Sequence, residues 1–198
     1  MRIGVVVIAV LVWVAPLPVA RAETAVARVH RYSVAGKGNV SDLEAFAAAV
    51  AQTYADPRGW NLGGTARFER VASGGALTLW LAADSQMETF GGACDVMWSC
   101  RSGRNVVINE DRWLGASPAW TQAGGNLRDY QHMVVNHETG HWLGFGHADC
   151  ASPGSAAPIM QQQSMNLGGC TPNPWPHPIL SVQDKDAIGR DTGNILEA

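Results

Sequence analysis

The sequence predicts an α+β domain in which a mixed, twisted sheet packs over one long helix. Two observations lead to this fold class. Several short segments with strand character surround a single early amphipathic helix. A later helical segment, Asn126 to Leu143, is apolar over much of its circumference. A helix of that kind belongs beneath a sheet and not on the protein surface.

The first 22 residues have the features of a secretory signal peptide. Arg2 supplies a positive start, an apolar run from Ile3 to Val14 follows, and Ala20-Arg21-Ala22 fits a small-x-small cleavage site. An uncleaved membrane anchor is the alternative, because the segment from Ile3 to Ala20 approaches the length that spans a bilayer. We expect cleavage after Ala22 and a secreted or extracytoplasmic location, which includes association with the cell envelope.

Residues 23–198 have the size of one domain with its own core. The leader carries Arg2 and Arg21 and no acidic residue, so its removal changes the formal charge from −3 to −5. No basic run or Lys/Arg-rich face is present, and we therefore expect no nucleic-acid partner.

The predicted elements of this domain follow one another in short segments. His30 to Ala35 alternates like a strand, and Ser41-Asp42-Leu43-Glu44 is a capping-box pattern, with Ser41 as the expected cap of a helix. Asp56-Pro57-Arg58-Gly59 ends that helix. Three later segments have strand character: Arg67 to Val71, Leu77 to Ala82 and Asn105 to Asn109.

The chain has four cysteines, Cys94, Cys100, Cys150 and Cys170. An even number in an exported chain predicts disulfides, and four cysteines allow three connectivities. Local pairing, Cys94 with Cys100 and Cys150 with Cys170, is the simplest of these. A second zinc site is the competing interpretation, but the chain contains no close C-x-x-C pair.

A metal-binding motif lies at the end of the long helix. His137 and His141 are four residues apart, so both imidazoles lie on one helix face and can reach a single ion. Gly144 can end the helix in a left-handed turn, which lets the chain return with His147 as a third ligand. Glu138 lies beside the first ligand and can act on a metal-bound water. Three imidazoles leave one zinc position open, which predicts a hydrolytic site with one catalytic Zn²⁺.

The stretch from His137 to His147 resembles the zinc signature H-E-x-x-H-x-x-G-x-x-H of the metzincin metallopeptidases. With the cysteines, Arg112-Trp113 and residues 160–163, the chain is also similar to secreted bacterial metzincin-like proteins without assigned substrates. The resemblance implies zinc bound by His137, His141 and His147, Glu138 as general base, and an extended peptide bound along an edge strand.

The resemblance also implies a Met-turn beneath the zinc site and a helix after it. Met160 in Ala157-Pro158-Ile159-Met160 is the expected turn methionine, and Met165 is its rival. The last helix should start near Ser181 and reach about Arg190. Gln162 stands where some metzincins have a tyrosine, and Ala148 matches none of the residues that mark the better-known subfamilies.

The predicted activity is peptide-bond hydrolysis by a monomeric, secreted zinc metallopeptidase acting on a peptide or protein. No membrane partner is expected beyond the possible signal anchor. The alternative is a secreted module that keeps zinc for folding and binds peptides or cell surfaces without turnover. Amide hydrolysis on cell-wall peptides also remains open.

Overall fold

The computed structural model of the chain describes residues 28–61, 64, 66–92 and 94–176. The predicted signal peptide and the predicted C-terminal helix lie outside these residues. Within them, the chain forms a mixed α+β fold whose elements follow in this order: β1 (Arg28–Lys37), α1 (Leu43–Ala55), β2 (Ala66–Arg70), β3 (Leu77–Ala82), a 3-10 helix (Asp84–Phe90), β4 (Cys100–Ser102), β5 (Asn105–Asn109), α2 (Glu110–Gly115), α3 (Pro118–Gln122) and α4 (Leu127–Trp142).

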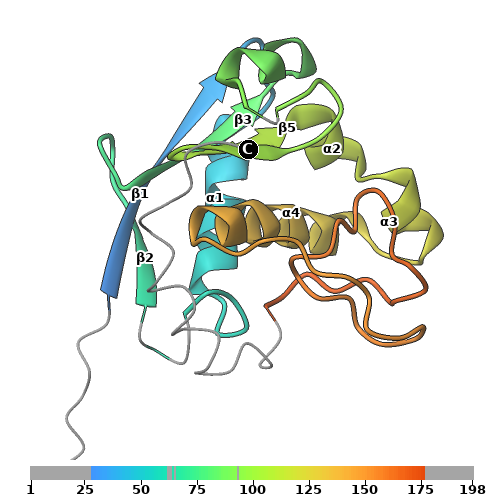
Figure 1. Cartoon of the computed structure of the whole chain (residues 1–198). Coiled ribbons are helices and arrows are strands. Elements are labelled where there is room, and N and C mark those ends of the chain that lie inside the picture. Colours follow the sequence, from blue (N-terminus) through green and yellow to red (C-terminus); the bar gives the residue numbers. More distant parts are fainter. Residues whose placement is uncertain (1–27, 62–63, 65, 93, 177–198) are drawn as a thin grey trace, which may run out of the picture.

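The described strands form one five-stranded mixed sheet in the order β2-β1-β3-β5-β4. Strands β2, β1, β3 and β5 run parallel to one another, and β4, at one edge, is antiparallel to β5. Helices α1 and α4 pack together on one side of the sheet, and α4 also contacts β5 and β4 (Figure 1). The long helix therefore lies beneath the sheet, as its apolar circumference predicts.

Side-chain alternation along the strands divides the core between the two faces of the sheet. Leu79 and Leu81 of β3, with Val106 of β5, belong to the large core shared with α1 and α4. Val107 and Cys100 face the other side, in a smaller cluster that includes Met87 of the 3-10 helix. This division decides which residues of the edge strand can face α4.

The structure confirms the predicted strands β3 and β5 over the predicted ranges, and it confirms β1, β2 and α1 within a few residues. The predicted cap of α1 is wrong by one residue. Asp42 is the N-cap, and its carboxylate accepts the Ala45 N–H at 2.9 Å. The backbone N–H of Ser41 instead donates to Glu110 Oε1 at 2.5 Å, which ties the start of α1 to α2.

Both disulfides join neighbours in sequence, as the simplest pairing predicts. Cys94 bonds Cys100, and Cys150 bonds Cys170, across sequence separations of 6 and 20 residues. The two bridges hint at an extracytoplasmic location, where disulfides persist. Among the described residues, no helix has the length and apolar character needed to cross a membrane.

Candidate metal centre

Helix α4 begins at a well-defined cap and is buried over most of its length. The side chain of Asn126 accepts the Asp129 N–H at 2.9 Å, which satisfies one of the free donors of the first turn. Tyr130, Val134 and His137 are buried at helical spacing, and His141 follows where the helix becomes half-buried. Leu127, in the first turn, is 40% exposed.

His137 and His141 each have one ring nitrogen held by a backbone carbonyl. The Nδ1–H of His137 donates to the Ile159 oxygen, and that of His141 donates to the Phe145 oxygen, both at 2.8 Å. A carbonyl can only accept, so these bonds place the proton on Nδ1 in both rings. The Nε2 atoms are thereby left with free lone pairs, the form in which histidine binds a metal.

Gly144 ends the helix in the way the motif requires. Its φ of 99° is open to glycine and strained for other residues, and the Phe145 N–H bonds back to the Gly140 oxygen at 3.0 Å. The chain then runs back along α4 and brings His147 beside the helix. The Ala148 N–H donates to the Met160 oxygen at 3.1 Å, which fixes the returning segment just after the third histidine.

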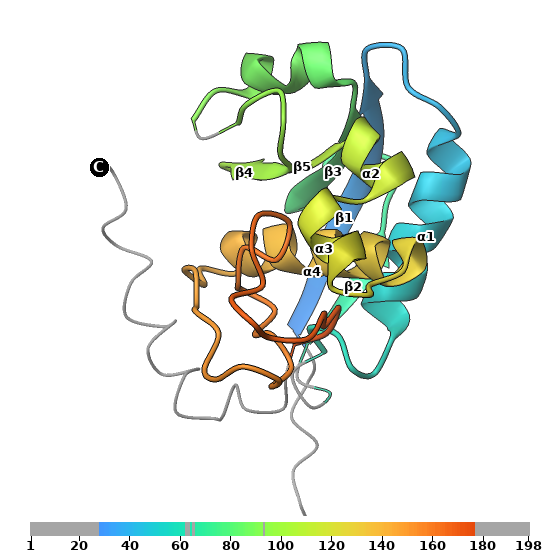
Figure 2. The ribbon, with the colours of Figure 1, turned by 90° about the vertical axis from the view of Figure 1, so that its right-hand side faces the viewer.

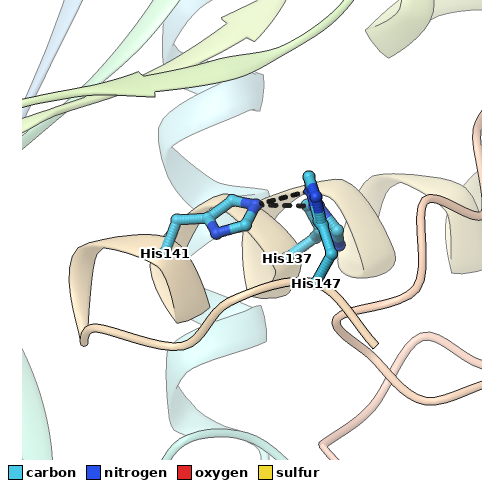
Figure 3. A group of neighbouring side chains, drawn as sticks. All are labelled: His137, His141 and His147. Carbon is cyan, nitrogen blue, oxygen red and sulfur yellow. Dashed lines mark hydrogen bonds between the residues drawn. The ribbon is translucent and has the colours of Figure 1, made fainter. Parts of the chain in front are cut away.

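The three histidines converge on one point (Figure 3). His141 Nε2 lies 3.2 Å from His137 Nε2 and 3.1 Å from His147 Nε2. Two of these atoms carry lone pairs that repel unless a cation lies between them. Zinc–nitrogen bonds of about 2.0–2.1 Å at a tetrahedral angle would place two nitrogens about 3.3 Å apart. The donor set and its spacing therefore fit a metal ion, and the cluster could hold one.

Burial disfavours the charged forms of His137 and His141. Burial lowers the pKa of His137 to about 3, with a further contribution from the nearby His141, so its imidazole is neutral at physiological pH. Burial also lowers the pKa of His141. His147 is exposed to solvent. Because a metal displaces protons from its ligands, histidines that stay neutral lose less binding energy to protonation.

Glu138 lies next to the first histidine and is 5% exposed. Burial raises the pKa of this carboxyl to about 8, while the positive charge of Arg101 acts in the opposite direction. A nearby divalent cation would favour the ionised form. The carboxyl and the three histidines line the same cleft, so Glu138 lies beside the candidate metal site.

Met160 lies directly against α4. The Gln161 N–H bonds to the Pro158 oxygen at 2.9 Å and closes a tight turn around Ile159 and Met160. A methyl group added at Gly140 would overlap Met160 Sδ. The turn can pack this closely on α4 only because residue 140 has no side chain. Met165, the rival candidate, is 48% exposed on the cleft wall. Met160 is thus buried against α4 at Gly140, whereas Met165 is exposed.

An open cleft of about 300 Å³ lies over the histidines. Its walls come from residues 95–101, from α4 and its return segment, and from residues 162–165. Figure 2 shows β4 on one side of α4 and the later loops on the other. A second hollow, of about 350 Å³, adjoins the first because His147, Gln162 and Met165 line both.

Two contributors to the site, Trp60 and Arg101, were missed at the level of sequence. Trp60 is buried against Gly140, donates its indole N–H to the Asn136 oxygen at 2.8 Å, and stacks on Phe145. A glycine inside a helical pattern often has a packing reason, so Gly140 was the available signal. Arg101 enters the cleft from β4, and no local pattern marks a three-residue strand.

Residues 17–178 match the family described as "Protein of unknown function (DUF3152)". The chain belongs to the DUF3152 family. The DUF3152 match includes all the described strands and helices, the three histidines, Glu138 and both disulfides. No curated protein matches the chain.

Proposed function

We propose that this chain is a secreted, zinc-dependent metallopeptidase of the metzincin type. One observation carries the proposal: three imidazole Nε2 atoms converge beside a buried carboxylate at the floor of an open cleft. In this proposal His137, His141 and His147 hold one zinc ion, and Glu138 is the general base.

Zinc is the metal that suits this donor set best. Three neutral imidazoles without a carboxylate or thiolate ligand are typical of catalytic zinc sites, and they leave a fourth position for water or substrate. A bound zinc ion would lower the pKa of a water molecule to about 7 and would polarise the scissile carbonyl. The carbonyl partners of His137 and His141 would orient the ligands and raise their basicity.

The side chain of Glu138 would carry the proton transfers. As a water molecule attacks the carbonyl carbon, the Glu138 carboxylate would remove one of its protons. When the carbon–nitrogen bond breaks, the same proton would pass to the nitrogen of the leaving amine. The enclosed position of Glu138 favours this role, because its protonated and ionised forms are closer in free energy than those of an exposed glutamate.

The surrounding fold supports a metzincin-like arrangement. Met160 packs under the ligand pair from a tight turn, at the position expected of a Met-turn methionine. Strand β4 is the last strand in the sheet order of the described residues, and it is antiparallel to β5 beside the cleft. An extended peptide could add to this edge as a further strand.

The shape of the site favours a polymer over a small molecule. The two adjoining hollows share His147, so open space continues from the cleft past the third histidine. A peptide bond held over the metal would have neighbouring residues on each side, and both hollows could receive them. The disulfides and the predicted leader agree with a secreted enzyme that acts on extracellular or cell-envelope peptides.

Substitution of Glu138 by glutamine tests the proposal. Zinc-loaded wild type and Glu138→Gln are offered a mixed peptide library, with a chelator-treated sample and Glu110→Gln as controls. Glu110 is a buried carboxylate outside the cleft lining. We expect chelator-sensitive cleavage by wild type and by Glu110→Gln, and a rate lower by about 10²–10⁴-fold in Glu138→Gln with unchanged zinc content.

Other outcomes are equally informative. Equal cleavage by wild type and Glu138→Gln would contradict the role of Glu138. If zinc-loaded wild type cleaves nothing but retains peptides as tightly as Glu138→Gln, the chain is a zinc-stabilised binding module and the peptidase proposal is wrong.

A further inference from the structure

The register of the edge strand directs one arginine toward the metal-binding helix. Arg101 of β4 pairs with Val106 of β5, and Cys100 pairs with Val107. Paired residues on neighbouring strands point to the same face of a sheet. Val106 belongs to the core shared with α4, whereas Val107 and Cys100 belong to the cluster on the other face. Arg101 therefore shares its face with α4, and it lines the cleft together with the three histidines.

In the described part of the chain, no carboxylate of the cleft forms an ion pair with Arg101. The two carboxylates of the lining are Asp95 and Glu138. Asp95 Oδ1 accepts the backbone N–H groups of Met97 and Trp98 at 2.7 and 3.1 Å, and Glu138 is buried next to a proposed ligand. Among the described residues, the ion pairs within 4.0 Å do not include Arg101. Its guanidinium is exposed and available to a bound molecule.

We propose that Arg101 makes this site selective for substrates that carry a carboxylate close to the bond to be cleaved. The inference rests on the proposed peptidase function and extends it to a substrate class. Arg101 would be a specificity-determining residue and not part of the proton-transfer machinery.

Two physical reasons support a carboxylate as the partner. A guanidinium presents N–H donors in a planar fork that matches the two oxygens of a carboxylate, and a charge-assisted pair of this kind is stronger than a neutral hydrogen bond. Arg101 also lies near enough to the site for its charge to act on Glu138 and His141. A substrate chain paired with β4 would therefore pass Arg101 close to the proposed metal.

The carboxylate could come from two sources. An Asp or Glu side chain of the substrate would make the site select acidic peptides in the middle of a chain. A free C-terminal carboxylate would make it act near the end of a chain. Both present the same group to Arg101, so the experiment must separate them.

The test measures binding, so that it does not depend on turnover. Zinc-loaded Glu138→Gln protein is immobilised, and four pools of acetylated random octapeptides are passed over it. The pools contain either Glu or Gln at one fixed position, no other acidic residue, and either a free or an amidated C-terminus. The same pools are offered to Glu138→Gln proteins that also carry Arg101→Gln, Arg101→Glu or Arg67→Gln. Arg67, an exposed arginine on β2 at the opposite edge of the sheet, is the matched control.

We expect at least one carboxylate-bearing pool to be retained about five- to tenfold better than the neutral pool, as for one charge-assisted contact at a partly exposed site. Preference for the Glu pool would identify an acidic side chain, and preference for the free C-terminus would identify a chain end. Arg101→Gln should abolish the preference, Arg101→Glu should reverse it, and Arg67→Gln should keep it. Melting temperatures should be unchanged, because Arg101 is exposed.

Zinc itself attracts carboxylates, and the arginine variants separate that effect from the proposed one. A preference that survives Arg101→Gln, or equal retention of all four pools, would overturn the inference. Cleavage in the Glu138 assay without an Arg101-dependent preference would leave the peptidase proposal standing and this one wrong. An Arg101-dependent preference in a protein that cleaves nothing would support carboxylate recognition by Arg101 and contradict the peptidase proposal.

Discussion

The two parts of the metal centre are held in place by different means. His137 and His141 belong to α4, a buried helix whose ligands are each fixed by a hydrogen bond to a carbonyl. His147 is exposed, and it lies on a segment with no α-helix or strand among residues 143–176 apart from a single bridge. Order in this segment comes from the Gly144 turn, from the bond between Ala148 and Met160, and from one disulfide.

This difference has a consequence for how the site is formed. A helix packed beneath a sheet keeps its geometry through burial, and it should hold two ligands in position without metal. A loop with few buried contacts opens at lower free energy than the core of a domain. We therefore expect the helix to be preorganised, and the return segment to depend on its cross-links and on the metal itself.

The largest effects should come from removal of the ligands. His137→Ala and His147→Ala should each weaken zinc binding more than about 100-fold, because loss of even an outer-sphere partner costs 10- to 100-fold. Without metal the two variants should differ. His137→Ala leaves the buried Ile159 carbonyl unpaired and should lower the free energy of unfolding by about 1–3 kcal/mol, whereas His147→Ala should change it little.

Zinc titration and denaturant unfolding of the zinc-free proteins would measure both quantities. Equal stability of the two zinc-free variants would contradict the proposed difference between helix and loop. Full zinc occupancy in either variant would remove that histidine from the ligand set.

An effect of similar size on stability is expected from the disulfides, and it should differ between them. Replacing Cys150 and Cys170 by serine opens a loop that the disulfide closes across a separation of 20 residues. Loop-closure entropy predicts that the free energy of unfolding falls by about 3 kcal/mol. The same change at Cys94 and Cys100 opens a loop with a separation of only 6 residues, so the free energy of unfolding should fall by about 1 kcal/mol less. Zinc affinity should fall in the first variant, because that bridge closes the return segment just after His147.

Thermal unfolding and zinc titration of both double variants would test this prediction. If the Cys94/Cys100 variant loses zinc affinity as strongly as the Cys150/Cys170 variant, the return segment is not what the second bridge stabilises.

The smallest effect concerns packing between the two parts. Gly140→Ala places a methyl group against Met160 Sδ and 2.9 Å from Trp60 Cζ2, and such overpacking typically costs about 1–3 kcal/mol. Gly115→Ala is the matched control, because a methyl group there meets no atom within 4 Å. We expect a lower melting temperature for the first variant and little change for the second. Similar melting temperatures would show that Met160 and Trp60 can shift at no cost.

The same contrast explains how far the sequence could predict the structure. Helix α4 and strands β3 and β5 were predictable because their apolar spacing repeats over several residues. His137, Glu138 and His141 were predictable because the motif fixes their spacing on one helix, and His147 because Gly144 lets the chain return. The turn around Met160 was predictable from Pro158 and from the resemblance to metzincins.

The parts that escaped prediction depend on contacts between distant segments. Strand β4 has three residues and exists through its pairing with β5, so no periodicity marks it. Arg101 enters the cleft only because of that pairing. Trp60 reaches the middle of α4 from a loop 76 residues before its hydrogen-bond partner, and Gly140 within the helix marks a close approach without showing which residue makes it. The cap of α1 was misplaced by one residue because Ser41 and Asp42 are adjacent and both are good cap residues, and it is the Asp42 carboxylate that accepts the Ala45 N–H.

The central claim is that one zinc ion lies between His137, His141 and His147, and anomalous X-ray diffraction tests it most directly. Crystals of zinc-loaded protein would be measured on both sides of the zinc absorption edge. The account predicts one strong anomalous peak per chain, about 2.0–2.1 Å from the Nε2 atom of each histidine, with a fourth position facing the cleft. A peak held by other residues, or no peak in protein that binds zinc in solution, would contradict it.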